Sequence, residues 1–317
     1  MPELPEVEAL AAYVASKARG RRIERVDLVS FAALKTASPP VSALVGREIV
    51  GARRRGKFLL VETRPNGASS EDRLWLIAHF ARAGWLRWHD PDPRGDEAVN
   101  PPPRRRSVGP AEGPGWASSR PAARGPVAMR VVLDDGSGFE LTEMGTQKRL
   151  AVYVARSPDE VEGIARLGIE PLDPRFDVVA LRELLAGRTG QLKRLISDQA
   201  LIAGVGNAYS DEALHAARLS PYRPAGNLSE EEVARLHASL TGVLRDGLCR
   251  NEGVPASELK DEKRSGMRVH GRTGEPCPVC GDTIREVVFG ERSFQYCPTC
   301  QTGGKPLADR RLSRLLK

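Results

Sequence analysis

The sequence predicts an α+β protein of several domains: an N-terminal β-sandwich with flanking helices, a helical domain, and a C-terminal β-hairpin held by four cysteines. Three observations predict this order. The first half alternates apolar and polar residues as strands do, the second half repeats apolar residues every three or four positions, and two Cys-x-x-Cys pairs stand near the end. A chain of 317 residues is long enough for two domains and an appended module.

The first domain, expected over 1–157, contains candidate strands rich in Val, Ile and Leu that are separated by Gly, Pro and Asn turns. These candidate strands are 22–29, 48–53, 58–63, 74–80, 129–133 and 150–154. Helices are expected before Gly20 and near 40–45, where they would flank the sandwich. The stretch at about 89–128 is mostly Pro, Gly, Arg and Ala, which cannot bury enough apolar surface to offset its ordering entropy. We therefore expect a disordered insertion in a hairpin.

The helical pattern follows an interdomain linker at 158–175 and extends over 176–262. Apolar spacing predicts helices at 178–186, 191–197, 207–216 and 230–251. Between the middle two, the segment Leu-Ile-Ala-Gly-Val-Gly-Asn at 201–207 predicts a double turn that closes on a helix N-cap. Free N–H groups at the start of that helix, together with the side-chain amide of Asn207, are suited to bind a phosphate oxygen. The alternative is that the two glycines form an ordinary tight turn.

The C-terminal module, expected over 263–302, carries four cysteines with the spacing of a four-thiolate zinc site. These cysteines are Cys277, Cys280, Cys297 and Cys300. Strands at 283–288 and 293–296 would form a hairpin too small to fold unaided, so the sequence predicts one structural Zn²⁺ that holds it and places Arg292 at its tip. Two disulfides or a redox pair are the alternatives. A basic tail, 303–317, follows.

Charge and composition agree with a nucleic-acid partner. The net charge is +7, and basic residues concentrate at 53–57, 104–106 and 310–311, where they can either follow phosphates or form a solvated surface. Aromatic residues make up only 5% of the chain, which argues against a single-strand binder built on stacking platforms. The acidic, proline-rich start resembles no secretory signal, and no apolar run reaches membrane-spanning length. We expect a cytoplasmic, nucleoid-associated protein with no membrane partner.

The chain starts with Met-Pro-Glu-Leu-Pro-Glu-Val-Glu. Loss of Met1 would leave a secondary amine at Pro2 beside carboxylates. An α-amino group has an ordinary pKa of about 7.7–8.0, so a useful fraction is unprotonated and can attack a sugar carbon near neutral pH. The alternative is that Pro2 and Pro5 stiffen the start of a helix whose first turn carries acids that suit its dipole.

Four motifs in this order resemble the formamidopyrimidine-DNA glycosylase and endonuclease VIII family of base-excision repair enzymes, the helix-two-turns-helix DNA glycosylases. They are Pro-Glu-Leu-Pro-Glu-Val-Glu at 2–8, Arg-Arg-Gly-Lys-Phe-Leu-Leu at 54–60, Gly-Val-Gly-Asn at 204–207 and Val-His-Gly-Arg-Thr-Gly-Glu-Pro-Cys at 269–277. The resemblance covers most of the chain. It implies that 176–262 is a helix-two-turns-helix DNA-binding domain and that the C-terminal module is a zinc finger.

The resemblance also implies catalytic roles. Pro2 would attack C1′ and form a Schiff base as the damaged base leaves. Glu3 would protonate or hydrogen-bond the sugar ring oxygen, for which a dry carboxylate with a raised pKa is suited. Glu6 would brace the amine, and Lys57 would hold a phosphate beside the lesion. β- and then δ-elimination would cut the strand, which makes the enzyme a glycosylase and an AP lyase.

The partner implied is damaged double-stranded DNA bound by a monomer. Asn207 and Arg292 would grip neighbouring phosphates, and Lys193 and Arg82 are further DNA-binding candidates. Two other functional classes of protein remain open. One is a non-catalytic binder of damaged or abasic DNA on the same scaffold, and the other is a zinc-finger regulator that binds undamaged duplex.

Three departures from the formamidopyrimidine branch leave the preferred lesion and opposite base open. Arg82 stands where that branch has a Met wedge, and it can stack in the gap, bind the orphaned base or reach a phosphate. A Glu-Met-Gly-Thr-Gln-Lys-Arg loop at 143–149 replaces the one that supplies two other gap fillers, so Met144 or Gln147 is a candidate substitute. The segment 257–267 is short where that branch has a loop over 8-oxoguanine.

Overall fold

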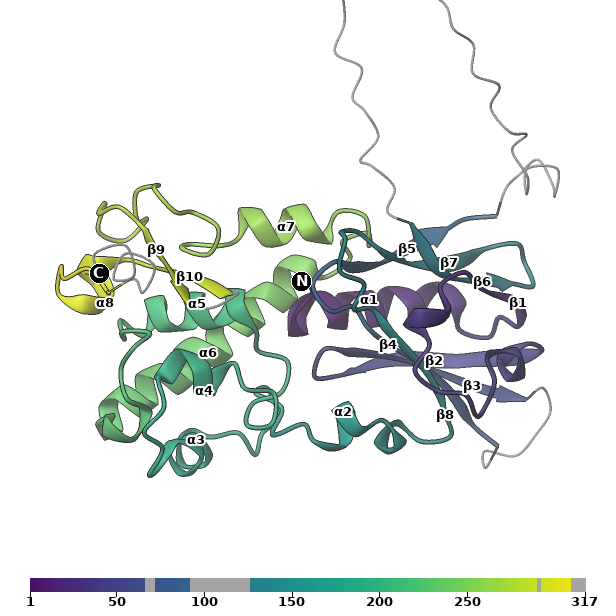
Figure 1. Cartoon of the computed structure of the whole chain (residues 1–317), viewed down its shortest axis with the longest axis horizontal. Helices are drawn as coiled ribbons and strands as arrows, with labels where there is room; N and C mark the ends of the chain where they lie inside the picture. Colours follow the sequence, from purple (N-terminus) through teal and green to yellow (C-terminus); the bar gives the residue numbers. More distant parts are fainter. Residues whose placement is uncertain (66–71, 92–125, 290–291, 309–317) are drawn as a thin grey trace, which may run out of the picture.

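The computed structural model describes residues 1–65, 72–91, 126–289 and 292–308 (Figure 1). A β-sandwich forms one half of the molecule, and helices with a small β-hairpin form the other half. The N-terminus lies between the two halves in Figure 1. The predicted fold class is confirmed, and the first residues of the chain occupy the junction on which the site depends.

Two four-stranded antiparallel sheets make up the sandwich. The first sheet contains, in spatial order, β2 (Arg47–Arg55), β3 (Phe58–Pro65), β4 (Leu74–His79) and β8 (Ala151–Ala155). The second sheet contains β1 (Ile23–Leu28), β6 (Val127–Leu133), β7 (Gly138–Glu143) and β5 (Gly84–His89). Their inner faces share one core with helix α1 (Leu4–Ala18), which buries Val7, Leu10 and Val14 against them.

Strands β5 and β7 were not predicted, and their pairing corrects the topology. Apolar and polar residues alternate over 139–142 of β7, as in a half-exposed strand, but all six residues of β7 are buried, including Glu140 and Glu143. Strands β5 and β6 both pair with β7 and not with each other. The prediction that the stretch at about 89–128 is an insertion in a hairpin is therefore wrong, because the strands on either side of it do not pair with each other. The prediction of disorder concerns mainly 92–125, which lie outside the described residues.

Helix α1 begins where its sequence predicts. Glu3 is the N-cap, and its backbone N–H donates to Glu6 Oε2 at 2.8 Å while its own carboxylate accepts from the backbone, which completes a capping box. The helix expected near 40–45 is a single 3₁₀ turn, η2 (Val41–Leu44). Further 3₁₀ turns are η1 (Phe31–Ala33), η4 (Pro158–Glu160) and η5 (Ala225–Asn227).

The helical half has its own core, built around Tyr209, Leu236 and Leu240. Its helices are α3 (Val178–Leu185), α4 (Leu192–Ile196), α5 (Asn207–Ala216), α6 (Glu230–Asn251) and α7 (Leu259–Ser265). Helix α2 (Glu162–Ala165) lies in the linker and packs Ile164 against Phe58 and Ile77 of the sandwich. Helix α7 was not predicted, because five of its seven residues are charged and only Leu259 is buried. The indole of Trp85 donates to the carbonyl of Ala256 at 2.8 Å, which fixes the start of this segment to the sandwich.

Glu170 joins the linker to the sandwich. Its carboxylate accepts from Arg54 Nη1 at 2.7 Å, from Arg55 Nη1 at 2.9 Å and from the backbone N–H of Gly56 at 2.7 Å. Arg54 also pairs with Glu8 at 2.8 Å. The suggestion that this basic run follows phosphates is therefore wrong for Arg54, because its largely buried guanidinium pairs with Glu8 and Glu170 inside the protein.

The C-terminal hairpin consists of β9 (Arg285–Phe289) and β10 (Arg292–Tyr296), followed by α8 (Pro298–Thr302). Val287, Phe294 and Tyr296 form a small cluster against Tyr222, which docks the hairpin on the helical half. Among the described residues, no helix is long and apolar enough to span a bilayer.

Candidate active site and metal centre

A cleft of about 1930 Å³ separates the sandwich from the helical half. Its walls come from the first residues of the chain, the β4–β5 turn, the starts of α4 and α5, helix α7 and the segment before the hairpin. Of the residues that the structure describes, nine Lys or Arg but only three Glu line it. The cleft exceeds the roughly 300–1,000 Å³ of pockets that enclose small ligands, and its positive walls suit a polyanion.

Glu3 lies on the N-terminus of α5. Its Oε2 accepts the N–H of Gly206 at 2.7 Å and of Tyr209 at 3.3 Å, and its Oε1 accepts the N–H of Ala208 at 2.9 Å. A carboxylate is favoured there by the positive end of the helix dipole. The expectation that these N–H groups are free for a phosphate is wrong, because Glu3 already occupies them. The N-cap of α5 is Gly206, and Asn207 is the first helical residue.

The pKa of Glu3 is lowered to about 2 in the DNA-free protein. Burial acts to raise this pKa, but the ammonium groups of Lys263 and Lys57 and the N–H of Ala208 outweigh it. The raised pKa expected for Glu3 when a flipped nucleotide keeps it dry stays a prediction. Glu3 is a carboxylate at neutral pH and is an acceptor, not a donor, before DNA binds.

Glu6 is fully buried behind Glu3. Its Oε1 accepts the hydroxyl of Tyr209 at 2.8 Å, and its Oε2 accepts Lys263 Nζ at 2.7 Å as well as the N–H of Glu3. These contacts fit the bracing role predicted for it. Lys263 was missed, since a lysine in a highly charged stretch carries no sequence signal that separates it from a solvated one.

Lys57 lies in the β2–β3 turn and is 7% exposed. It lines the same cleft as Pro2, Glu3 and Glu6, so the structure brings all four predicted catalytic residues together. Burial, assisted by the Lys57 charge, lowers the pKa of His79 to about 4. His79, another residue of the cleft wall, is therefore neutral at pH 7.

The candidate gap fillers lie on two adjacent loops. Arg82 in the β4–β5 turn and Met144 after β7 both line the cleft, and the N–H of Met144 donates to the carbonyl of Ala83 at 3.1 Å. Gln147 is exposed and does not line the cleft. The geometry therefore favours Met144 over Gln147 as the substitute.

Lys193 is nearly buried between α4 and α5. Its ammonium donates to the carbonyl of Asn207 at 2.7 Å, to Ser210 Oγ at 2.9 Å and to Asp211 Oδ1 at 2.5 Å. An ammonium has three donors, so Lys193 can bind a phosphate directly only by releasing one of these partners. Its DNA-binding role stays a prediction.

Asn207 and Arg292 belong to the junction of α5 and the hairpin. Asn207 Nδ2 donates to the carbonyl of Ser293 at 2.6 Å. Asn207 and Ser293 both line the cleft. Arg292 opens β10 opposite Phe289, at the turn end of the hairpin as predicted, while its side chain lies outside the described residues. The phosphate contacts of both residues stay predictions.

Two acids of α5 hold the segment before the hairpin. Glu212 accepts the backbone N–H groups of Arg268, Val269 and His270, each at 2.9 Å. Asp211 Oδ2 lies 2.7 Å from His270 Nδ1, and the imidazole of His270 faces the cleft. Sequence reasoning missed these acids because their partners lie more than fifty residues away.

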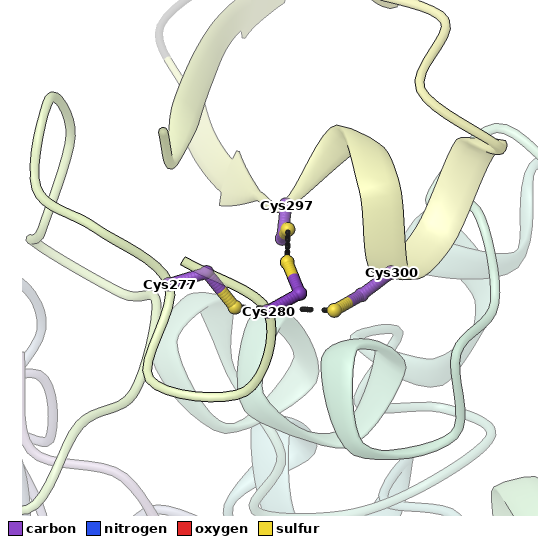
Figure 2. Close-up of side chains that lie close together, drawn as sticks. All are labelled: Cys277, Cys280, Cys297 and Cys300. Carbon is purple, nitrogen blue, oxygen red and sulfur yellow. Dashed lines mark hydrogen bonds between the residues drawn. The ribbon is translucent and has the colours of Figure 1, made fainter. Parts of the chain in front are cut away.

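The four cysteines of the hairpin module form one cluster (Figure 2). Cys277 and Cys280 come from the loop before β9, and Cys297 and Cys300 from the start of α8. Their sulfurs all lie within 4.8 Å of one another. A tetrahedral zinc with Zn–S bonds of about 2.3 Å requires S···S separations of about 3.8 Å, so this cluster fits the ion and the cysteines are free thiols, not disulfides.

His215 of α5 contacts the cysteine cluster and was not predicted. Its Nε2 lies 3.3 Å from the sulfur of Cys277, and its Nδ1 has no hydrogen-bond partner among the described residues. Burial lowers the pKa of His215 to about 4, so the imidazole is neutral. His270 does not belong to the cluster, which consists of the four cysteines.

Comparison with known proteins identifies the family. Three family models match the chain: the formamidopyrimidine-DNA glycosylase N-terminal domain at 1–108, its H2TH domain at 167–257 and the zinc finger found in FPG and IleRS at 274–303. A formamidopyrimidine-DNA glycosylase of Symbiobacterium thermophilum is 35% identical, with 95% of this chain and 89% of that protein covered. The chain belongs to the formamidopyrimidine-DNA glycosylase family.

Other similarities agree with this assignment. A formamidopyrimidine-DNA glycosylase-like protein of Mycobacterium tuberculosis is 60% identical over 48% of this chain and 94% of its own length. The structure of MutM (Fpg) from Thermus thermophilus superposes with a TM-score of 0.72 at 30% identity, covering 96% of this chain and all of that one. The Lactococcus lactis enzyme bound to DNA with an AP site gives 0.72 at 25% identity, covering 95% and 99%.

Membership makes this chain a DNA glycosylase of base-excision repair, as the motifs predicted. The match to the zinc-finger model and the geometry of the four sulfurs make the hairpin module a structural zinc site. Zinc supplies the cross-link that a hairpin of two five-residue strands cannot supply by its own core.

Proposed function

We propose that this protein is a bifunctional DNA glycosylase and AP lyase that acts as a monomer on damaged bases in duplex DNA. The observation that carries the proposal is the position of Pro2, in a positively charged cleft beside Glu3, Glu6 and Lys57. The structure of the Lactococcus lactis relative bound to DNA with an AP site supports damaged DNA as the partner.

The proposed chemistry starts once Met1 is removed. The lone pair of the Pro2 amine forms a bond to C1′ as the bond from C1′ to the base breaks; the base leaves with that electron pair and takes a proton from water. The amine loses its N–H proton to Glu3, which is ionised and can accept it. Glu3 then returns that proton to O4′ as the C1′–O4′ bond breaks and the iminium forms.

Strand cleavage follows from the iminium. Its positive charge makes the C2′ proton acidic, so removal of that proton expels the 3′ phosphate, and a second elimination expels the 5′ phosphate. Water then hydrolyses the iminium and returns the amine. In this proposal, Glu6 braces the start of α1 and takes no proton, since it is already shared by three donors.

The DNA would be bent across the cleft with the damaged nucleotide turned out of the stack. Lys57 would hold a phosphate beside the lesion, and Asn207 and Arg292 would bind its neighbours. Arg82 and Met144 would occupy the space that the base leaves. Lys193 would act mainly by fixing the start of α5.

A non-catalytic binder of damaged DNA is the second candidate, and the altered gap-filling loops favour it. One assay separates the two. Protein shown to lack Met1 is incubated with duplexes that carry an abasic site, 8-oxoguanine or an oxidised pyrimidine, and borohydride is added.

We expect a covalent adduct that peptide mapping assigns to Pro2, and its yield ranks the lesions. DNA binding without an adduct on any substrate would exclude the lyase and leave the binder. Specific binding to undamaged duplex would instead support a regulator.

A further inference from the structure

We propose that Lys263 of helix α7 is a positioning residue, which fixes the two carboxylates of α1 and keeps the Pro2 amine unprotonated by placing a positive charge beside it. The inference rests on the proposed nucleophile. Nothing in the sequence motifs assigns a role to this lysine or to α7.

The first support is distance. Lys263 Nζ lies 3.3 Å from the carbonyl oxygen of Met1, whose carbon is bonded to the nitrogen of Pro2. One C=O bond and one C–N bond separate that oxygen from the nitrogen, so the ammonium lies no more than about 6 Å from the future amine. Lys263 donates an N–H to the carbonyl of Met1. When Met1 is removed, this N–H loses its acceptor and faces the Pro2 amine.

The second support is that Lys263 is held rigidly and remains charged. It donates to Glu6 Oε2 at 2.7 Å, lies 3.7 Å from Glu3 Oε1, and its side chain is only 14% exposed. Burial acts to lower the pKa of Lys263, but the two carboxylates outweigh it and raise that pKa. A lysine that stays protonated is a source of positive field and not a competing nucleophile.

The third support is the charge balance around the amine. The charges that act on the terminal amine come from α1 and α7; they are Glu3, Glu6, Lys260 and Lys263. Lys57 of the β2–β3 turn and His270 before the hairpin line the same cleft and act on Glu3, while the Tyr209 hydroxyl of α5 donates to Glu6. In the chain that retains Met1, burial lowers the pKa of the terminal ammonium, and Lys263 is the strongest charge that lowers it further. Without Lys263, the nearest charges would be the carboxylates, which favour the protonated amine.

The test compares pH profiles of borohydride trapping on abasic duplex for protein that lacks Met1. Trapping rises with pH as the amine loses its proton, and this acidic limb reports the amine pKa. We expect Lys263→Met to move the limb upward by about one pH unit, a loss of about tenfold in rate below it. Lys263→Arg keeps the charge and should leave the limb in place.

Two controls address folding and specificity. Lys260→Met removes a cation from the same helix, one whose ammonium packs 4.5 Å from the Trp85 ring centre, and should move the limb less. In a Glu6→Gln background, the carboxylate that Lys263 contacts at 2.7 Å is absent, and Glu3 keeps its hydrogen bonds from the N–H groups of Gly206 and Ala208 when Lys263 is changed to Met. This double variant should still show an upward shift relative to Glu6→Gln alone.

The inference would be overturned if folded Lys263→Met protein shows the same acidic limb in its trapping profile as the parent. In that case adduct formation by the parent would still support the proposed function. If the parent forms no adduct, the proposed function fails instead. A ¹⁵N NMR titration of the terminal proline then measures the amine pKa without DNA. An unchanged pKa in Lys263→Met would reject the role, and a raised one would support it.

Discussion

The carboxylate of Glu3 caps helix α5 at Gly206, with Glu3 Oε2 2.7 Å from the Gly206 amide nitrogen. A residue at the start of the chain is thus held by a helix of the other half, which lies beyond the linker. The N-terminal domain and the helical domain therefore share one site. A substitution of Gly206 should displace the carboxylate of Glu3, the proposed proton carrier.

Gly206→Ala should displace Glu3. A Cβ at this position would lie 2.5 Å from Glu3 Cδ and 2.7 Å from Lys57 Nζ, closer than packed atoms allow. We expect at least about a tenfold loss of base excision and about 1–3 kcal/mol of destabilisation. Single-turnover excision and urea unfolding measure the two effects.

Gly242→Ala is the matched control. Gly242 lies inside α6 with nothing within 4 Å of an added Cβ, so alanine there should stabilise the helix by about 0.5–1 kcal/mol and leave excision unchanged. Equal activity of both glycine variants would show that the contact with Glu3 is not needed.

Pro2→Gly should reduce trapping and strand cleavage by about tenfold or more while DNA binding is retained. A secondary amine gives an iminium that is always charged, whereas a primary amine gives an imine that must first be protonated. Borohydride trapping and gel-shift titration of the same sample separate chemistry from binding. Trapping at the parent rate would contradict the nucleophile assignment.

Glu3 should make stability depend on pH in acid. Its folded pKa, about 2, is below the ordinary value of 4.5, so its contribution is complete above about pH 4.5 and is lost as the pH falls toward 2. The full contribution is of the order of 3 kcal/mol. Urea unfolding of the parent and of Glu3→Gln should differ most at pH 7 and converge near pH 2. A constant difference across this range would show that Glu3 titrates normally in the fold.

Cys297→Ser should release zinc and weaken DNA binding more than it alters the N-terminal chemistry. Cys297 is fully buried in the cluster, and β10 ends just before it, so loss of the metal should unfold the hairpin that carries Arg292. Metal analysis and DNA titration test this. Cys249→Ser, on the exposed face of α6, should keep the zinc and the affinity. Full binding after zinc loss would disprove the role of the finger.

His215→Phe should speed zinc loss to a chelator by about tenfold. The imidazole is neutral, and donation from its Nε2 to the sulfur of Cys277 would stabilise the thiolate form. Stopped-flow zinc release measures the rate, and the charge-transfer bands of the Co²⁺-substituted protein report the sulfur directly. His237→Phe, whose imidazole contacts the carbonyl of Phe176 instead, serves as the control. Identical release rates for the parent and His215→Phe would refute the contact.

The sequence by itself determined the features that depend on neighbouring residues. The helix at 230–251 follows from apolar spacing and from the Ser229 capping box, and its bounds were predicted as found. The zinc ligands follow from two short spacings, because a tetrahedral site needs two close pairs of thiolates. The start of the chain indicated a nucleophile with adjacent acids, because their order along the chain is itself the motif.

Only the tertiary structure decided the state of those residues. The low pKa of Glu3 arises from α5 and from Lys57 and Lys263, which lie far from it in sequence. Strand β7 was missed although its residues 139–142 alternate, and the burial of Glu140 and Glu143 in it could not be read from that pattern. Helix α7 was missed because a single buried residue, Leu259, is too little to reveal a helix. Local patterns fix which elements form, but charge and hydrogen bonding at the cleft depend on which distant elements meet there.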